Sequence, residues 1–199
     1  MFTRLAVDEI APTYLVVARL FLASILLGPI FIRKKDLVLM SKEIPSILIL
    51  GIINAALPFF LFAYAAQDLS AGMLSILNGT SPLFALIIAI TWFRQNTTLM
   101  QIFGLGLGFI GLLVFIGIDQ LTFIFYPVLL CLIGAFCYAY SNNILFKLNH
   151  IKSAALASVT MISGFFFSLP LIFLEPTNFS LDLSLKIIFA IFFLGLVST

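Results

Sequence analysis

Residues 68–117 read DLSAGMLSILNGTSPLFALIIAITWFRQNTTLMQIFGLGLGFIGLLVFIG, two apolar runs joined by the polar link 94–97. Each run has about the 20 residues that an α-helix needs to cross the hydrocarbon core of a bilayer. The first run carries Ser75, Asn78 and Pro82 near its middle, where lipid offers no hydrogen-bonding partner. These polar groups must therefore face protein or a water-filled cavity, and the stretch predicts two membrane-spanning helices.

The composition extends this prediction to the whole chain. Of its 199 residues, 63% are hydrophobic and only 9% are charged. A soluble domain of this length could not cover so much apolar surface, so the length sets the number of membrane spans. The net charge of +2 is too small to indicate a nucleic-acid partner. The predicted partner is the lipid bilayer.

The spacing of the apolar runs predicts an all-α polytopic membrane protein with about seven transmembrane helices. Spans are expected near 12–32, 44–66, 70–93, 98–118, 122–146 and 153–174, with a last one that begins near 184. From Lys186 the last span would be about 21 Å long at 1.5 Å per residue, shorter than a core of about 30 Å. We therefore expect the chain to end inside a helix and to be incomplete.

The basic residues are confined to alternate links between the spans. Links 33–43, 94–97 and 147–152 together hold seven Lys or Arg residues, whereas the other three links hold none. Cytoplasmic links of membrane proteins carry an excess of Lys and Arg. The pattern predicts a multi-pass protein of the inner membrane with these three links in the cytoplasm and Met1 outside.

Arg19 is the only charged residue deep within a predicted span. A charge at the centre of a span costs about 2.5–3.5 kcal/mol on insertion scales, so it normally faces the helix bundle. One interpretation is that Arg19 anchors an anionic or carboxylate-bearing substrate. The other is that it snorkels to the interface or binds the carbonyls of a broken neighbouring helix.

Two spans carry the pattern Asn-x-x-x-Pro at mid-membrane depth, as Asn54 with Pro58 and as Asn78 with Pro82. Proline has no N–H, so it frees the carbonyl of the asparagine four residues earlier and kinks the helix. We interpret these segments as kinked helices that line a shared cavity, in which Asn54, Asn78 and Ser75 bind substrate. The alternative is a structural hydrogen bond between the two asparagines.

The second span also predicts one continuous face. In a regular α-helix, Gly51, Asn54, Pro58, Phe62 and Ala65 fall within a narrow stripe. Such a stripe would form the edge of a binding pocket from one kink and one side-chain amide.

Tyr138 is the deepest polar residue of the fifth span. Its hydroxyl and ring predict a residue that hydrogen-bonds or stacks on a substrate. Tyr140, Asn142 and Asn143 lie closer to the interface, where an anchoring role is expected.

Gly104, Gly108 and Gly111 lie on one face of the fourth span and predict close packing against another helix. A dinucleotide site is excluded because no strand precedes these glycines. No nucleophile–base pair, metal-ligand cluster or carboxylate pair lies at membrane depth. We therefore predict no catalytic residues, no metal and no cofactor, and rank a membrane enzyme third among the functions.

Two stretches follow distinctive patterns, Ala-Gly-x-x-Ser-x-Leu-Asn-x-Thr-x-Pro-Leu-Phe-Ala at 71–85 and Gly-x-x-x-Gly-Phe-x-Gly at 104–111. In these patterns the chain resembles the EamA-like branch of the drug/metabolite transporter superfamily. Pro12 and Arg19, which open a helix that ends in basic residues, add to it. The sequence departs from the family at Arg94, where a Glu is common.

The resemblance implies ten helices arranged as two inverted five-helix repeats around a central cavity. Residues 1–118 would then be a first repeat that lacks its first helix, and 119–199 the start of a truncated second repeat. Pro29 ends the first span and Pro170 ends the sixth, which run in opposite directions by the charge rule. This spacing also indicates an inverted repeat.

The first hypothesis for function is a carrier that exports small metabolites by alternating access. Its small-molecule substrate is not specified by the sequence, and we allow for a homodimer. The alternative hypothesis is a non-transporting seven-helix membrane scaffold or sensor.

Overall fold

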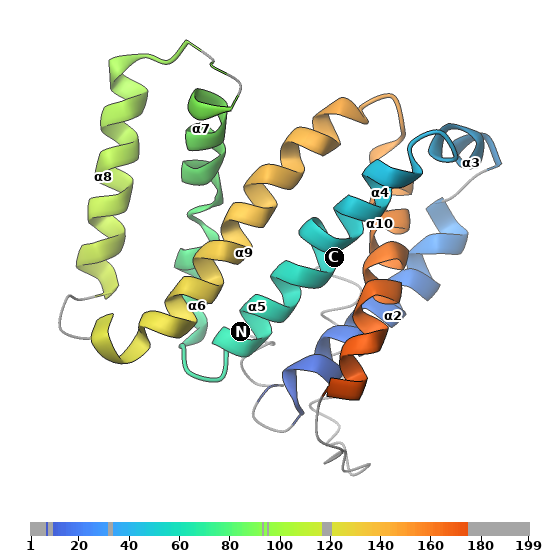
Figure 1. Ribbon diagram of the computed structural model, residues 1–199, viewed down its shortest axis with the longest axis horizontal. Coiled ribbons are helices and arrows are strands. Elements are labelled where there is room, and N and C mark those ends of the chain that lie inside the picture. Colours follow the sequence, from blue (N-terminus) through green and yellow to red (C-terminus); the bar gives the residue numbers. More distant parts are fainter. Residues whose placement is uncertain are drawn as a thin grey trace.

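The computed structural model describes residues 7, 10–31, 34–92, 94, 96–116 and 121–174, and every regular element in these ranges is a helix (Figure 1). Most are α-helices, η1 is a π-helix and η3 is a 3₁₀-helix. In chain order the elements are α2 (Pro12–Phe31), α3 (Lys34–Met40), α4 (Ile44–Leu50), η1 (Gly51–Ala56), α5 (Leu57–Ala65), α6 (Ala71–Asn78), α7 (Ser81–Thr91), α8 (Leu99–Ile116), α9 (Leu121–Lys147), α10 (Ser153–Ser168) and η3 (Leu169–Leu174).

The prediction of an all-α polytopic membrane protein is confirmed. Segments long and apolar enough to cross a membrane are Pro12–Ile30, Ile44–Ala65, Ala71–Thr91, Ile124–Lys147 and Ser153–Phe173. Helix α8 contains a shorter apolar stretch, Leu99–Leu112, and corresponds to the predicted fourth span. The predicted last span, which begins near 184, lies outside the described residues.

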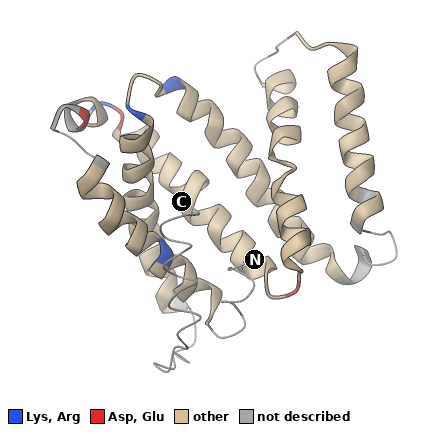
Figure 2. Ribbon diagram, turned by 180° about the vertical axis from the view of Figure 1, so that it is seen from behind, with Lys and Arg blue, Asp and Glu red and all other residues tan. Residues whose placement is uncertain are grey.

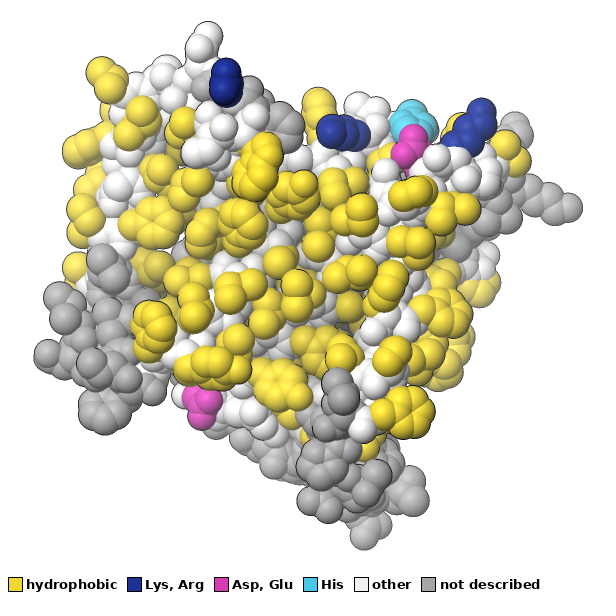
Figure 3. All heavy atoms as spheres, viewed as in Figure 1, with side chains coloured by type: hydrophobic (Ala, Val, Ile, Leu, Met, Phe, Trp, Pro, Cys, Tyr) yellow, Lys and Arg dark blue, Asp and Glu magenta, His cyan; other side chains and the backbone are white. Residues whose placement is uncertain are grey.

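The charged residues mark the two ends of the bundle. In the described part of the chain, the Lys and Arg residues lie together at one end, apart from the single arginine in α2 (Figure 2). Asp68 lies in the link between α5 and α6 at the other end. Hydrophobic side chains cover the surface between the two ends (Figure 3). This distribution matches a hydrocarbon layer between two aqueous phases.

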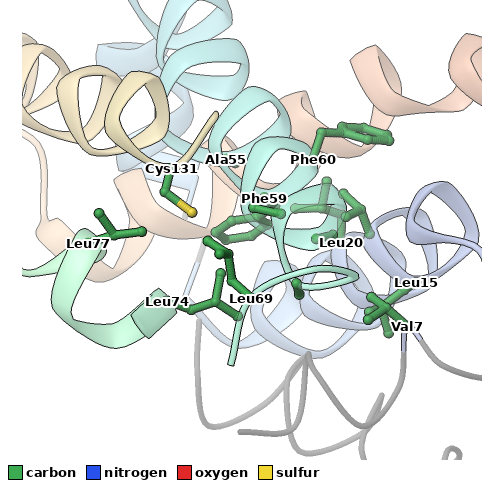
Figure 4. Close-up of a cluster of buried hydrophobic side chains, with 14 of the residues drawn as sticks. Val7, Leu15, Leu20, Ala55, Phe59, Phe60, Leu69, Leu74, Leu77 and Cys131 are labelled. Atoms are coloured by element: carbon green, nitrogen blue, oxygen red, sulfur yellow. The ribbon is translucent and has the colours of Figure 1, made fainter. Parts of the chain in front are cut away.

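Helices α2, α5, α9 and α10 form the body of the molecule, while α6, α7 and α8 stand on the far side of α9 (Figure 1). The most extensive packing is between α2 and α10. A buried cluster joins α2, α5, α6 and α9 through Leu20, Phe59, Leu77 and Cys131 (Figure 4). Inside a bilayer such a cluster stabilises the fold through van der Waals contact, because lipid tails are as apolar as leucine.

The second span is not a regular α-helix, because η1 interrupts it. The backbone N–H of Leu57 donates to the carbonyl of Ile52, five residues earlier, as in a π-helix. This wide turn ends directly before Pro58, which has no N–H to donate. The predicted single stripe is therefore wrong, because the extra residue rotates the two halves of the span. Gly51 faces α10, whereas Phe62 faces α9.

Helix α10 crosses η1 with almost no space between the backbones. A Cβ atom added to Gly51 would overlap the side chain of Ser163 and lie 2.9 Å from the backbone nitrogen of Gly164. A Cβ added to Gly164 would lie 2.8 Å from the Cβ of Ala55. Small residues permit this close approach, which gives membrane helices their packing energy.

The third span is divided into two helices. Helix α6 ends at Asn78, and α7 begins at Ser81 with a proline in its first turn. The hydroxyl of Thr80 donates to the carbonyl of Leu77 at 2.6 Å, and the hydroxyl of Ser81 donates to the carbonyl of Asn78 at 2.7 Å. The carbonyl of Leu77 also accepts from the backbone N–H of Thr80 at 3.2 Å, whereas Pro82 has no N–H to donate to Asn78, so Ser81 satisfies that carbonyl instead.

The glycine face of α8 is only partly in contact with the rest of the described chain. Gly108 packs against Leu83, whose Cδ2 would lie 2.9 Å from an added Cβ. Positions 104 and 111 have no described atom within 4 Å of an added Cβ. The predicted close packing is thus seen at one of the three glycines among the described residues.

The crossing of α10 and η1 predicts that Gly51→Ala destabilises the protein by about 1–3 kcal/mol, the usual effect of overpacking a tight core. Thermal unfolding in detergent measures it. The matched control is Gly72→Ala, because an added Cβ there meets no atom within 4 Å and alanine favours a helix. Equal unfolding temperatures for the two variants would show that the crossing is not sterically tight.

Candidate functional site

Arg19 projects from the middle of α2 towards α5. Its guanidinium carbon lies 3.7 Å from the centre of the Phe59 ring, and the side chain is half-buried. A cation over an aromatic face gains about 0.5–2 kcal/mol, which offsets part of the cost of a charge at membrane depth. The ring is a stabilising neighbour that carries no formal charge.

Tyr138 approaches the same region from α9. Its ring stacks on Phe62 of α5, with 6.2 Å between ring centres and 20° between ring planes. Gly134, one turn earlier on α9, gives Phe62 room, because an added Cβ would lie 2.9 Å from that ring. Tyr138 is also close enough to Arg19 for the two side chains to interact electrostatically. The interface of α5 and α9 thus places the phenol of Tyr138 within electrostatic range of the arginine.

Asn54 links the π-helix to α9 through a side-chain hydrogen bond. The hydroxyl of Ser141 lies 2.8 Å from Oδ1 of Asn54 and 2.8 Å from the backbone carbonyl of Tyr138. Asn54 therefore bonds to α9 and not to the other asparagine of the repeated pattern. Its amide nitrogen is the group that remains for a ligand or for water.

Three of the five predicted substrate-binding residues come together. Arg19, Asn54 and Tyr138 lie on α2, η1 and α9. The hydroxyl of Ser141 bonds both the side chain of Asn54 and the backbone carbonyl of Tyr138, and the side chains of Tyr138 and Arg19 interact electrostatically. With Phe59 and Ser141, these three residues form one group inside the bundle. We call it the arginine–tyrosine site.

Ser75 and Asn78 do not reach this site. Both side chains are exposed on α6, while Leu74 and Leu77 of the same helix are buried in the core. The hydroxyl of Ser75 donates to the carbonyl of Ala71 at 2.9 Å. Their predicted role in binding stays a prediction.

An apolar hollow of about 450 Å³ opens at the end of the bundle away from the basic links. It lies between α2, α5, α9 and η3, and its polar groups include the hydroxyls of Thr13, Tyr64 and Tyr126. The Thr13 and Tyr64 hydroxyl oxygens are 3.3 Å apart. None of the predicted substrate-binding residues lines this hollow, although α2, α5 and α9 are shared with the arginine–tyrosine site.

The sequence profile of the EamA-like transporter family matches residues 1–117, more than half of the chain. The chain belongs to the EamA-like transporter family. An uncharacterized transporter of Archaeoglobus fulgidus is 27% identical over 164 residues, which cover 79% of this chain and 56% of the relative. The uncharacterized transporter YdfC of Bacillus subtilis is 26% identical over 207 residues, which cover 98% of this chain and 64% of the relative.

This EamA-like chain therefore spans less than two thirds of the length of these curated relatives. No solved structure matches it. The predicted resemblance is confirmed, while the names of the relatives assign no substrate.

Sequence reasoning about this EamA-like chain missed three contributors to the site, Phe59, Gly134 and Ser141. A signal for two of them was present, because residues 134, 138 and 141 follow the spacing of one helical face around the predicted Tyr138. No sequence pattern singles out Phe59 among 23 phenylalanines. Phe59 is the ring that contacts Arg19 because of where α2 crosses α5.

The Asn54–Ser141 contact predicts a measurable coupling between η1 and α9. Asn54→Leu and Ser141→Ala should have non-additive effects on the free energy of unfolding. The interaction energy between the two sites should be about 0.6 kcal/mol and at most about 1.7 kcal/mol, the range for hydrogen bonds between membrane helices. Unfolding in detergent of the two single variants and the double variant gives this value. Asn54→Leu combined with Ser158→Ala is the control, because Ser158 on α10 donates to Ala154 and Leu27. Additive effects of Asn54→Leu and Ser141→Ala would show that the two side chains do not form a stabilising hydrogen bond.

Proposed function

We propose that the protein carries small organic anions across the inner membrane, out of the cell, by alternating access. The observation that carries the proposal is Arg19, held inside the bundle against Phe59 and beside Tyr138. A charged group at this depth is a functional candidate in membrane proteins. Membership of a transporter family supports transport over a scaffold or sensor.

Arg19 would bind the negative group of the substrate. A guanidinium offers several N–H donors in a planar fork that fits a carboxylate or a phosphate. Tyr138 and the amide nitrogen of Asn54 would bind neutral polar atoms of the same molecule. The apolar hollow near Thr13 supports a substrate with an apolar portion, since it adjoins three of the same helices.

Two interruptions in the spans support a moving bundle. Segment η1 and the break after Asn78 place irregular backbone at membrane depth, followed by Pro58 and Pro82. Interrupted helices that line a midplane site are common in secondary transporters, where one bundle rocks against another. We propose that the two segments are the hinges of this motion.

The exposed side chains of Ser75 and Asn78 fit the same proposal. A carboxamide at membrane depth faces protein or water, because hydrocarbon leaves it unsatisfied. We propose that this face of α6 borders the transport pathway together with the arginine–tyrosine site.

The arrangement of spans supports an inverted repeat. Helices α2 and α10, which begin at opposite ends of the bundle, pack along each other more extensively than any other pair of elements. We propose that they are equivalent helices of two repeats, at 1–118 and 119–199. The basic end of the bundle would face the cytoplasm.

The first experiment raises expression of the gene in its host and compares metabolites in the medium and in the cells with those of a vector control. We expect one or more small carboxylates or phosphate esters to accumulate outside. Accumulation inside would contradict export, and an unchanged anion profile with other solutes altered would contradict the substrate class.

Arg19→Gln should lower flux of the identified anion at least about 30-fold at sub-saturating concentration, since removing one partner of a buried charge pair costs about 2 kcal/mol or more. Arg19→Lys, which keeps the charge and loses the planar fork, should fall between the wild type and Arg19→Gln. Arg94→Gln is the matched control, because Arg94 lies in the α7–α8 link at the basic end. Equal flux in Arg19→Gln and Arg94→Gln would contradict the anchoring role.

Asn78→Leu tests the carrier against the scaffold. For a carrier we expect loss of flux with normal amounts of protein in the membrane, because the carboxamide borders the pathway. Ile76→Leu, also exposed on α6, is the control and should retain flux. Flux that survives Asn78→Leu would place this face of α6 outside the pathway.

A further inference from the structure

A second hollow, of about 380 Å³, lies between α4 and α10. We call it the α4–α10 groove. Its walls include Ile44 and Leu48 of α4 together with Val159, Ile162 and Phe166 of α10. Ile44, Leu48 and Phe166 are exposed at the surface of the bundle. The groove is thus an apolar furrow on the membrane-facing side of two spans, separate from the arginine–tyrosine site.

The groove follows α10 from the basic end of the bundle towards its middle. It begins at Met40 and Ser41, in the basic link, and ends at Phe166 of α10. On α10 the lining extends from Val159 to Phe166, a rise of roughly 10 Å at 1.5 Å per residue, compared with about 15 Å for half of a hydrocarbon core. A furrow of this length accommodates part of one extended acyl chain.

Positive charge lies at the open end of the groove. Lys42 is exposed and directly follows Ser41. Lys152 is exposed and precedes Val159 by seven residues, close to two helical turns, so it lies above the same face of α10. Of the nearby acidic groups, Asp36 is buried and the carboxylate of Glu43 accepts a hydrogen bond from Ser46.

We propose that the α4–α10 groove binds one anionic phospholipid from the cytoplasmic leaflet. Its phosphate contacts Lys42 and Lys152, and one acyl chain lies along Leu48 and Val159. The charge at the opening matches an anionic headgroup, and basic sites between membrane helices at the cytoplasmic face favour such lipids. The apolar walls match an acyl chain.

The floor of the groove contacts η1, one of the two segments proposed as hinges. Ser163 lines the groove and lies directly against Gly51, the first residue of η1. A bound acyl chain therefore packs against the segment that carries Asn54.

Native mass spectrometry of the full chain in detergent tests the site, with phosphatidylglycerol and phosphatidylcholine of identical acyl chains as probes. We expect one phosphatidylglycerol to be retained in preference to phosphatidylcholine. Lys42→Gln and Lys152→Gln should each weaken this preference about fivefold, the contribution of one lysine near an anionic surface. Arg94→Gln and Lys147→Gln, at the same end and away from the groove lining, should leave it unchanged.

A matched pair of substitutions tests the acyl-chain position. Leu48→Trp fills the groove and should abolish retention of the lipid. Ile49→Trp is its control, because Ile49 lies outside the groove lining and both residues are similarly exposed, at 42% and 47%. The proposal would be overturned if the two tryptophan variants lost lipid retention equally. It would also be overturned if the four charge variants changed the preference for phosphatidylglycerol equally. An absence of retained lipid together with a second protein copy in the spectrum would overturn it as well, and would make the groove a protein interface.

Discussion

A backbone that crosses hydrocarbon must satisfy its N–H and C=O groups without water, and this constraint governs the fold. It makes every regular element of the described chain a helix. It also explains how the two irregular positions persist. At η1 the N–H of Leu57 reaches the carbonyl of Ile52, and after α6 the hydroxyls of Thr80 and Ser81 bond the carbonyls of Leu77 and Asn78. The helices are irregular at positions where another backbone or side-chain group completes the hydrogen bonds.

The same constraint determines which groups surround Arg19 in the arginine–tyrosine site. A guanidinium at membrane depth needs neighbours that compensate for lost water, and Arg19 has the ring of Phe59 at 3.7 Å. An aromatic face attracts a cation through the quadrupole of the ring. Phe62 and Gly134 then position the ring of Tyr138, which lies within electrostatic range of the arginine. The site thus holds a guanidinium and a phenol together at membrane depth.

Close packing at η1 connects the site to the surface of the bundle. Gly51 allows α10 to approach, and the π-helix turns Asn54 towards Ser141 of α9. One six-residue segment therefore contacts two helices through different faces. This geometry makes the α4–α10 groove and the arginine–tyrosine site neighbours of a single irregular element.

The sequence by itself determined the fold class, the positions of six spans and the family, because hydropathy, charge and the motif at 71–85 are local properties of the chain. It also singled out Arg19, Asn54 and Tyr138, since a polar group within an apolar run is visible without a structure. The tertiary structure decided which of these residues meet. Asn54 bonds Ser141, Arg19 lies over Phe59, and Ser75 and Asn78 remain on a separate exposed face. The physical reason is helix rotation. A π-turn of one extra residue redirects every side chain after it, and no hydropathy pattern records the angle at which two helices cross.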